Sequence, residues 1–304
     1  MVSSRTLPFP GARRFSLLLP GSPGLMHGLD FGDGQRPIEG VFLHANGFCA
    51  STYRSMLAPI AQSHRVLAVD QRGHGRSELE ADPRGRGDWL DLRDDVLAAL
   101  GALGAGPVVL SGHSMGGTVA LLAAVAEPHR VKALVLFDPV LLHPDVVAQR
   151  HQWKPGDPWP ELPLVQGALR RRSSFESRAA AEAALVGRGA FKTWPRAAVA
   201  DYCLDGLREL PNGGVGLACD PKWEASSYCA QGHDGWRALA EVRCPVSIVR
   251  GASGSTCDEG TVHEYARAAL TVSVAPGTTH FVPLERPDLA AAALGSVLSR
   301  ERPA

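Results

Sequence analysis

The sequence predicts an α/β fold in which a doubly wound, mostly parallel sheet carries a mainly helical cap insertion. Short apolar runs that end in polar or glycine-rich turns alternate with segments of helical periodicity, which is the order expected of parallel strands and crossover helices. This alternation stops near Leu142 and resumes near Trp236. We therefore expect a core in two parts, residues 1–142 and 236–304, and a cap or lid at residues 143–235.

The elements of the core are expected in a regular order. Each predicted strand is a continuous apolar run, as is typical of strands buried on both faces. An insertion between two core strands would lie over the carboxyl ends of the strands, where open α/β sheets bind their ligands. Strands are predicted at 41–44, 66–70, 107–110, 131–137, 246–250 and 270–275, and helices at 52–62, 88–103, 114–126 and 287–299.

Charge and cysteine content narrow the kinds of partner. The 31 Lys and Arg residues balance the 31 Asp and Glu residues, so we expect no nucleic-acid or membrane partner and a small neutral or apolar substrate. The six cysteines show no CxxC pair and no metal-ligand spacing, which predicts free thiols in a reducing compartment and a cytoplasmic location. The alternative is a single disulfide among Cys203, Cys219 and Cys229. The apolar run at 17–20 is too short for a signal-peptide core.

A nucleophile elbow is predicted at residues 112–116, which read Gly-His-Ser-Met-Gly. The motif Gly-x-Ser-x-Gly directly follows a predicted strand and precedes a predicted helix, which is the context in which it presents a reactive serine. The free N–H groups and the dipole of the following helix favour negative charge that develops near Ser114. We therefore interpret Ser114 as a nucleophile, with a purely structural turn as the alternative.

A serine hydroxyl is a weak nucleophile and needs a base, usually a histidine that a carboxylate orients. His280 is the best candidate, because it follows the last predicted strand and the flexible residues 276–279 and precedes the terminal helix. The alternative is a surface histidine. His113 is adjacent to the serine and is expected to point elsewhere, and His74 is expected to pack in a structural turn.

Four motifs, in the same order along the chain, resemble those of the α/β-hydrolase superfamily. The oxyanion-loop motif of the family begins His-Gly, and here Ala45 stands in place of that glycine. The resemblance covers roughly residues 25–140 and 240–300 and implies the α/β-hydrolase fold, with the family's variable cap in between. The motifs are His-Ala-Asn-Gly-Phe at 44–48, Asp-Gln-Arg-Gly-His-Gly-Arg-Ser at 70–77, the elbow at 112–117 and the catalytic-histidine loop at 277–281.

The acid of the implied triad is the point at which the sequence departs from the family. Many members carry an aspartate a few residues after the strand predicted at 246–250, but residues 251–258 read Gly-Ala-Ser-Gly-Ser-Thr-Cys-Asp, with no carboxylate at that spacing. Some members, certain lipases among them, place the acid one strand earlier, where this sequence has Asp138. We expect Asp138 to orient His280. The alternatives are Asp258, a cap carboxylate, a dyad without an acid, and a purely turn-forming role for the aspartate.

The resemblance implies a carboxylesterase-like serine hydrolase that needs no metal and no organic cofactor. An acyl-enzyme would form on Ser114, and its oxyanion would be held by the backbone N–H of Met115 and by that of Asn46 or Phe48. A carbon–carbon bond hydrolase, thioesterase, lactonase or cofactor-free haloperoxidase would share the triad. A non-catalytic ligand-binding or receptor protein on this fold is a further alternative. Serine at the elbow argues against haloalkane dehalogenases and epoxide hydrolases, which carry aspartate there.

Aromatic residues of the insertion are the candidates for substrate contact. Trp194 and Trp223 are expected to line an apolar pocket over the elbow. The alternative is that they pack in a small core of the cap itself. The oligomeric state is not set by any feature of the sequence.

Overall fold

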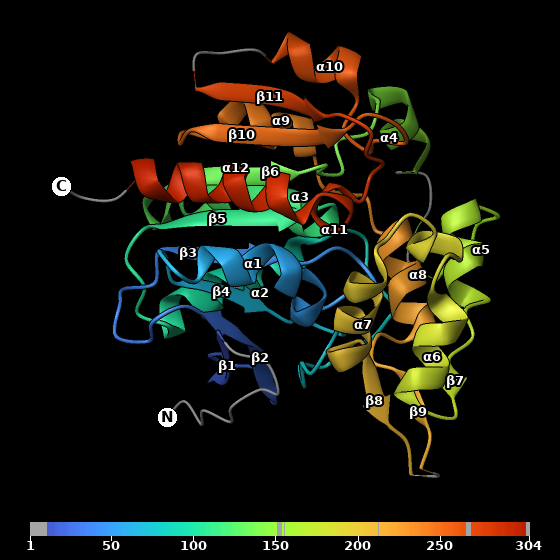
Figure 1. Cartoon of the computed structure of the whole chain (residues 1–304). Helices are drawn as coiled ribbons and strands as arrows, with labels where there is room; N and C mark the ends of the chain where they lie inside the picture. Colours follow the sequence, from blue (N-terminus) through green and yellow to red (C-terminus); the bar gives the residue numbers. More distant parts are fainter. Residues whose placement is uncertain (1–10, 151–153, 155, 212, 266–268, 302–304) are drawn as a thin grey trace.

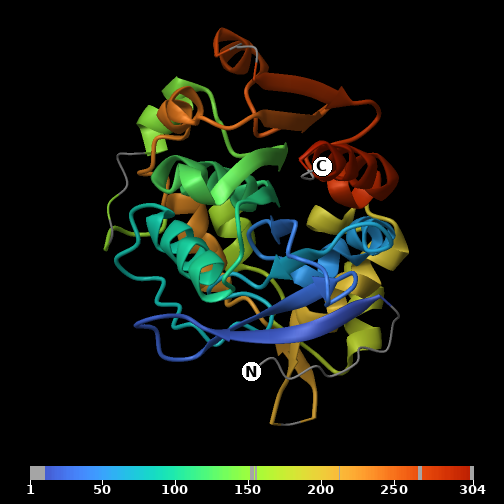
Figure 2. The same cartoon turned by 90° about the vertical axis from the view of Figure 1, so that its left-hand side faces the viewer.

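The computed structural model describes residues 11–150, 154, 156–211, 213–265 and 269–301. In this part of the chain, eight strands form a central sheet with helices on both faces (Figures 1 and 2). This arrangement confirms the α/β fold with a mostly parallel sheet.

The strand order of the sheet is β1-β2-β4-β3-β5-β6-β10-β11, and only β2 runs against its neighbours. Every residue of β3, β4 and β5 is buried, which agrees with the continuous apolar runs of the sequence. The strands are β1 (Ala12–Leu18), β2 (Leu25–Phe31), β3 (Gly40–Leu43), β4 (Val66–Val69), β5 (Val108–His113), β6 (Val131–Phe137), β10 (Val246–Gly251) and β11 (Leu270–Ala275).

The hairpin of β1 and β2 at one edge of the sheet is not among the predicted strands. Arg13 and Arg14 interrupt the apolar pattern of β1, because an edge strand needs to bury only part of its surface. Asp30 on β2 binds the guanidinium groups of Arg13 and Arg65, each at 3.0 Å. A strand held by ion pairs in this way lacks the apolar signature on which the prediction relies.

Helices cover both faces of the sheet and enclose two apolar cores. Helices α1 and α12 pack together on one face, and α2, α3 and α9 pack together on the other. The core helices are α1 (Arg54–Ile60), α2 (Leu90–Ala102), α3 (Met115–Ala126), α9 (Gly235–Glu241), α10 (Glu259–Glu264), α11 (Val282–Glu285) and α12 (Pro287–Arg300), with 3-10 turns η1 (Ala50–Tyr53) and η2 (Pro128–Arg130).

The cap segment, residues 143–235, lies beyond the carboxyl end of β5 (Figure 1). It is mainly helical, as predicted, but it also holds a short antiparallel sheet in the order β7-β9-β8. Its elements are α4 (Pro144–Arg150), α5 (Pro163–Leu169), β7 (Ser174–Phe175), α6 (Arg178–Leu185), η3 (Gly189–Phe191), α7 (Arg196–Asp205), β8 (Leu207–Glu209), β9 (Val215–Leu217) and α8 (Pro221–Cys229).

Two buried carboxylates of α7 attach the cap segment to the core. Asp201 accepts hydrogen bonds from Arg54 Nε at 2.6 Å and from Ser55 Oγ at 2.9 Å. Asp205 accepts a bidentate pair of bonds from Arg14 at 2.8 and 2.9 Å. Removing one partner of such a buried pair leaves the other charge buried without a counter-ion. The cap is therefore held to the core by interactions that are costly to break.

Within the described ranges, no helix combines the length and apolar character that a membrane crossing needs. The six cysteines form no disulfide in this part of the chain.

Three buried histidines lie in loops and strand ends near the carboxyl edge of the sheet. Burial lowers the pKa of His44 to about 4 and that of His113 to about 3, and it holds the pKa of His74 well below its usual range. Burial and the nearby charge of Asp205 raise the pKa of Asp70 to about 7. The folded chain therefore keeps these histidines neutral at pH values at which an unfolded chain would protonate them.

We expect acidification from about pH 7 to about pH 5 to destabilise the protein. Histidines with a depressed folded pKa contribute stability that is lost as the pH falls below their unfolded pKa. Asp70 acts in the opposite sense, because its folded carboxyl group holds a proton up to about pH 7. Unfolding near pH 5 then takes up more protons at the three histidines than it releases at Asp70, so the free energy of unfolding should fall as the pH falls. Urea unfolding at a series of pH values measures this dependence.

The control is His129→Gln, because the side chain of His129 is 73% exposed and the substitution leaves the three buried histidines in place. A free energy of unfolding that stays constant over this pH range would contradict the neutral state of the three histidines.

Candidate active site

Ser114 lies in the sharp turn between β5 and α3, with φ 55° and ψ −121°, a region that side-chain-bearing residues rarely adopt. The close approach of strand and helix requires glycine on both sides. A Cβ atom at Gly112 would lie 2.4 Å from the carbonyl oxygen of Gly116, and one at Gly116 would lie 2.3 Å from that of Leu43. The elbow predicted from the motif is therefore a strained turn that projects the serine from the end of β5.

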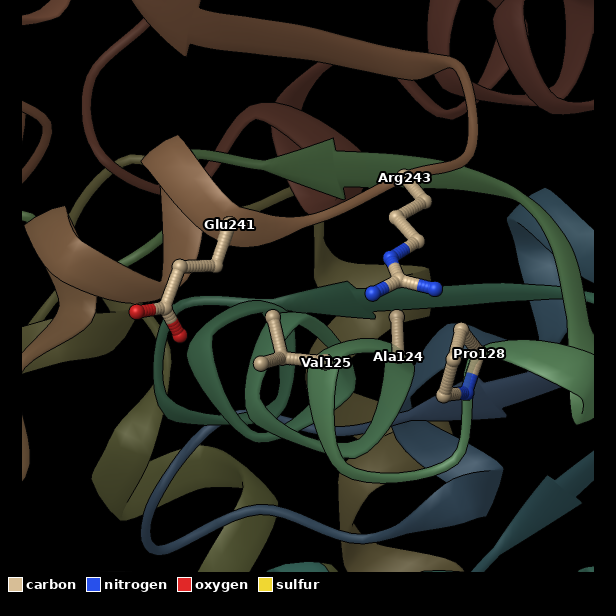
Figure 3. A pocket seen from close by; sticks show the side chains of 5 residues that line it. All are labelled: Ala124, Val125, Pro128, Glu241 and Arg243. Carbon is tan, nitrogen blue, oxygen red and sulfur yellow. The ribbon is translucent and has the colours of Figure 1, made fainter.

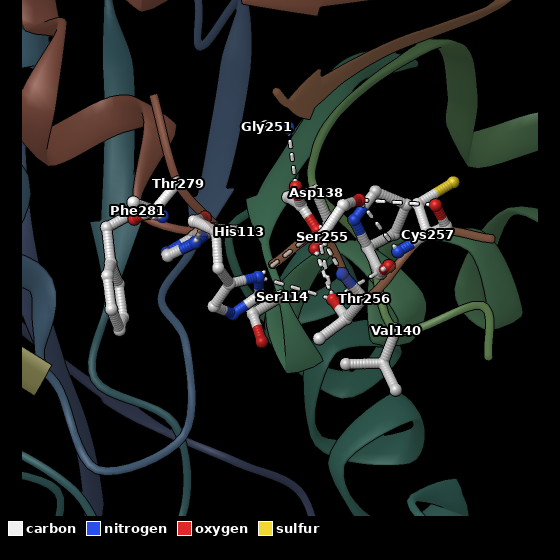
Figure 4. Close-up of polar contacts among 12 residues, drawn as sticks. His113, Ser114, Asp138, Val140, Gly251, Ser255, Thr256, Cys257, Thr279 and Phe281 are labelled. Carbon is white, nitrogen blue, oxygen red and sulfur yellow. Dashed lines mark hydrogen bonds and ion pairs between the residues drawn. The ribbon is translucent and has the colours of Figure 1, made fainter. Parts of the chain in front are cut away.

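Asp138 directly follows β6, and its fully buried carboxylate meets His280. Oδ1 of Asp138 lies 3.1 Å from Nδ1 of His280. The same carboxylate accepts hydrogen bonds from the backbone N–H groups of Gly251 at 2.6 Å and Thr256 at 2.7 Å, and from Ser255 Oγ at 3.1 Å (Figure 4). Two strands and the histidine loop thus converge on one carboxylate.

These contacts keep the carboxylate of Asp138 ionised. Burial alone would raise its pKa, but the hydrogen bond and charge of His280 and the N–H groups of Gly251 and Thr256 outweigh burial and lower the pKa below its usual value. A permanently charged acceptor on Nδ1 fixes the histidine tautomer and stabilises the imidazolium that forms when Nε2 takes a proton.

The loop after β10 does not place a carboxylate of its own against His280. It places hydrogen-bond donors against Asp138 instead. Oγ1 of Thr256 lies 3.1 Å from Asp138 Oδ1 and 3.3 Å from His280 Nδ1. The carboxylate of Asp258 is used elsewhere, since it caps α10 by accepting bonds from the N–H and the hydroxyl of Thr261 at 2.8 and 2.7 Å. The structure brings Asp138, and not Asp258, into contact with His280.

The backbone N–H groups of Asn46 and Met115 have no acceptor among the described residues. Both residues line the same cavity as Ser114. The N–H of Phe48 already donates to the carbonyl of Ala45 at 3.2 Å. Of the two candidates in the oxyanion loop, Asn46 therefore has the available donor.

A hydrogen-bonded chain connects the oxyanion loop with the histidine loop. The N–H of Ala45 donates to the hydroxyl of Tyr53 at 3.0 Å, and this hydroxyl lies 2.7 Å from Nδ1 of His113. Nε2 of His113 lies 2.9 Å from the carbonyl oxygen of His280. Because His113 is neutral, one consistent arrangement has Tyr53 donating to Nδ1 and Nε2–H donating to that carbonyl. The sequence offers no signal for this role of Tyr53.

Ser114 and His280 line a cavity of about 600 Å³ between the core and the cap segment. Apolar residues from both parts form most of its wall, among them Met115, Val140, Leu142, Leu164, Ala168, Leu185, Phe191 and Phe281. The wall also carries polar residues, among them Asn46, Tyr228, Gln231 and Thr256. Its charged residues are Arg171 and Glu224, which pair with each other, and the exposed Arg188. A wall of this kind suits an apolar group with one polar reacting end.

Neither Trp194 nor Trp223 lines this cavity, which corrects the prediction. The ring of Trp194 packs behind the wall, with its centroid 4.8 Å from that of Phe48 and 4.7 Å from that of Phe191. Trp223 faces the core instead and donates from Nε1 to the carbonyl of Arg72 at 3.1 Å. The position of an aromatic residue in the sequence does not show whether its side chain lines a cavity. Trp89 and Phe191 do line this cavity, and the sequence did not indicate them.

A hollow of about 420 Å³ lies at the opposite end of α3, between Ala124 and Arg243 (Figure 3). Ser114 precedes the first residue of that helix, so the hollow is not part of the site. Among the described residues, no group of three or more His, Cys, Asp or Glu side chains could hold a metal ion.

Comparison with known proteins places the chain in a family. Residues 41–293 match the model of the alpha/beta hydrolase family. The chain belongs to this family. The match spans the oxyanion loop, the elbow, the cap segment and His280.

Individual relatives show which activities this fold carries elsewhere. The chain is 26% identical over 257 residues to 2-(acetamidomethylene)succinate hydrolase of Mesorhizobium japonicum, covering 82% of this chain and 84% of that one. It is 37% identical over 100 residues to the sn-1-specific diacylglycerol lipase ABHD11 of Mus musculus, over only 32% of this chain and 31% of the lipase. A crystal structure of E-2-(acetamidomethylene)succinate hydrolase has the same fold, with a TM-score of 0.77 and 22% identity over 98% of this chain and all of that one.

We predict that Asp138→Asn lowers kcat for ester substrates by about 10⁴-fold, because an amide at this position favours the wrong tautomer of His280. Asp258→Asn is the matched control. Asparagine remains a good helix cap, so this variant should keep nearly full activity. Steady-state kinetics of both purified variants compares their kcat values. If Asp138→Asn kept full activity while Asp258→Asn lost it, Asp258 rather than Asp138 would be the acid.

Tyr53→Phe is expected to lower the free energy of unfolding by about 1–3 kcal/mol, because it leaves the N–H of Ala45 and Nδ1 of His113 buried without partners. Tyr265→Phe serves as the control, since that ring is only partly buried and stacks on Trp236. Urea denaturation of the two variants gives the comparison. Equal stabilities would mean that the hydroxyl of Tyr53 does not matter to the fold.

Proposed function

We propose that this chain is a carboxylesterase-like serine hydrolase that cleaves its substrate through an acyl-enzyme on Ser114. The observation that carries the proposal is the convergence on one cavity of a serine in a strained elbow, a histidine whose Nδ1 contacts a buried carboxylate, and two N–H groups without acceptors. Nucleophile, oriented base and oxyanion donors are the parts that acyl transfer requires.

The reaction follows from these positions. Ser114 Oγ attacks the carbonyl carbon while His280 Nε2 accepts the hydroxyl proton, and the ionised Asp138 stabilises the resulting imidazolium. The negative charge on the substrate oxygen is held by the N–H groups of Asn46 and Met115, each of which lowers the barrier by roughly 3 kcal/mol. The proton then passes from His280 to the leaving alcohol, the acyl-enzyme forms, and water activated by the same histidine releases the acid.

A small neutral or apolar acyl substrate fits the cavity best. Its wall is mostly apolar, and the buried charge of Arg171 is already neutralised by Glu224. A carboxylate buried beside the Arg171–Glu224 pair would be desolvated without a free counter-ion, which is unfavourable. The exposed guanidinium of Arg188, which also lines the cavity, would tolerate a carboxylate only at the solvent side.

The same residues would also serve a thioesterase, a lactonase, a carbon–carbon bond hydrolase or a cofactor-free haloperoxidase. A panel of ester, thioester, lactone and diketone substrates separates these activities. A non-catalytic protein on this fold would bind without turnover and would not react with a fluorophosphonate.

Ser114→Ala should abolish ester turnover and fluorophosphonate labelling while the fold remains intact, because the hydroxyl is the nucleophile. Ser247→Ala is the control, since Ser247 lies on β10 and its hydroxyl accepts a hydrogen bond from that of Thr271 across the sheet, away from the cavity. Labelling followed by mass spectrometry identifies the modified residue. Turnover at the wild-type rate in Ser114→Ala would refute the proposal.

A further inference from the structure

Helix α8 of the cap segment contacts the oxyanion loop through both the side chain and the backbone of Glu224. Nδ2 of Asn46 donates to the backbone carbonyl of Glu224 at 2.9 Å. The carboxylate of Glu224 lies directly over Gly47, where a Cβ atom would be 2.8 Å from Oε1. Gly47 has φ +77° and donates its N–H to Nε2 of His74 at 3.0 Å. The two residues of the loop are thus fixed from the cap side and from the core side.

The carboxylate of Glu224 is held in turn by two other elements of the cap segment. Arg171, which follows α5, forms an ion pair with it, and Nη2 of Arg171 donates to the hydroxyl of Tyr202 on α7 at 3.0 Å. Glu224 and Tyr202 are buried, and the side chain of Arg171 is 18% exposed. A hydrogen-bonded cluster in such surroundings has one favoured arrangement.

The neighbouring residue of α8 fixes the helix to the core. Nε1 of Trp223 donates to the carbonyl of Arg72, and Gly73 leaves room for the ring, since a Cβ atom there would lie 2.3 Å from Nε1. Nδ1 of His74 lies 2.9 Å from the same carbonyl. Helix α8, the turn at 72–74 and the oxyanion loop therefore form a closed set of contacts.

We propose that Glu224 and Arg171 are positioning residues that hold the N–H of Asn46 where the oxyanion forms. Neither residue needs to contact the reacting atoms. They act through Asn46 and Gly47, so the cap segment sets the rate of the chemical step as well as the shape of the cavity. This inference rests on the proposed function, because it assigns a role within the same acyl transfer.

The test uses full-length Glu224→Gln, Arg171→Met and the double variant R171M/E224Q. Each single variant should lower kcat for p-nitrophenyl butyrate by about tenfold or more while KM stays within about twofold, because an oxyanion donor acts in the transition state. Affinity for a trifluoromethyl ketone, which forms the tetrahedral adduct, should fall by the same factor as kcat. The matched control is R196M/E182Q, which removes a cap ion pair of 2.7 Å that does not touch the loop.

Thermal denaturation separates positioning from mere stability. Each single variant leaves a buried charge unpaired and should lower Tm, whereas the double variant should recover much of it. If kcat stays low in the double variant after Tm has recovered, the positioning role is supported. If kcat recovers together with Tm, or if KM rises while kcat stays unchanged, the proposal is overturned.

Hydrogen–deuterium exchange of the segment 44–48 gives a readout that does not depend on the substrate. Exchange there should accelerate in all three variants and remain unchanged in R196M/E182Q. Unchanged exchange in Glu224→Gln would overturn the proposal even if Ser114 proves to be the nucleophile. A failure of the acyl-enzyme proposal is recognised separately, because the Ser114→Ala variant would then retain turnover.

Discussion

The arrangement of the site depends on one buried carboxylate at the end of β6. Asp138 accepts hydrogen bonds from Gly251 at the end of β10, from Thr256 in the following loop and from His280, so it joins two strands and the histidine loop at a single point. Its backbone has φ 43°, a left-handed conformation that aspartate tolerates better than most residues. Without this charge the N–H groups of Gly251 and Thr256 would be buried without an acceptor. The same contacts that shape the loop therefore orient the base.

The core and the cap segment contribute different parts of the site. In the proposed mechanism, the core supplies the serine, the acid, the base and the N–H of Met115, which lie at or just after the carboxyl ends of strands, as expected of an open α/β sheet. The cap segment closes the cavity with apolar side chains and fixes the oxyanion loop through α8. Buried ion pairs of α7 keep the two parts together. Chemistry and enclosure are thus built on different elements that meet at residues 44–48.

The core could be predicted from the sequence because its signals are local. Continuous apolar runs marked the buried strands, and a glycine on either side of Ser114 marked the elbow. The choice of Asp138 came from the resemblance to members that place the acid one strand earlier, together with the lack of a carboxylate at residues 251–257. The features that were missed depend on contacts between distant residues. Asn46 and its partner Glu224 are 178 positions apart, and nothing local distinguishes the N–H of Asn46 from that of Phe48.

The contact between α8 and the oxyanion loop has a consequence for how this protein could diversify. A cap that only covered the cavity could be exchanged without harm to the chemistry. Here an exchanged cap would have to bring a carbonyl group for the side chain of Asn46 and a side chain that fits over Gly47. Among the described residues, 186–188 make neither of these contacts, and Arg188 lines the cavity, so changes there should alter specificity and leave the oxyanion loop in place. A chimera should therefore keep α8 with the core and graft new specificity onto the segment around α6 and η3.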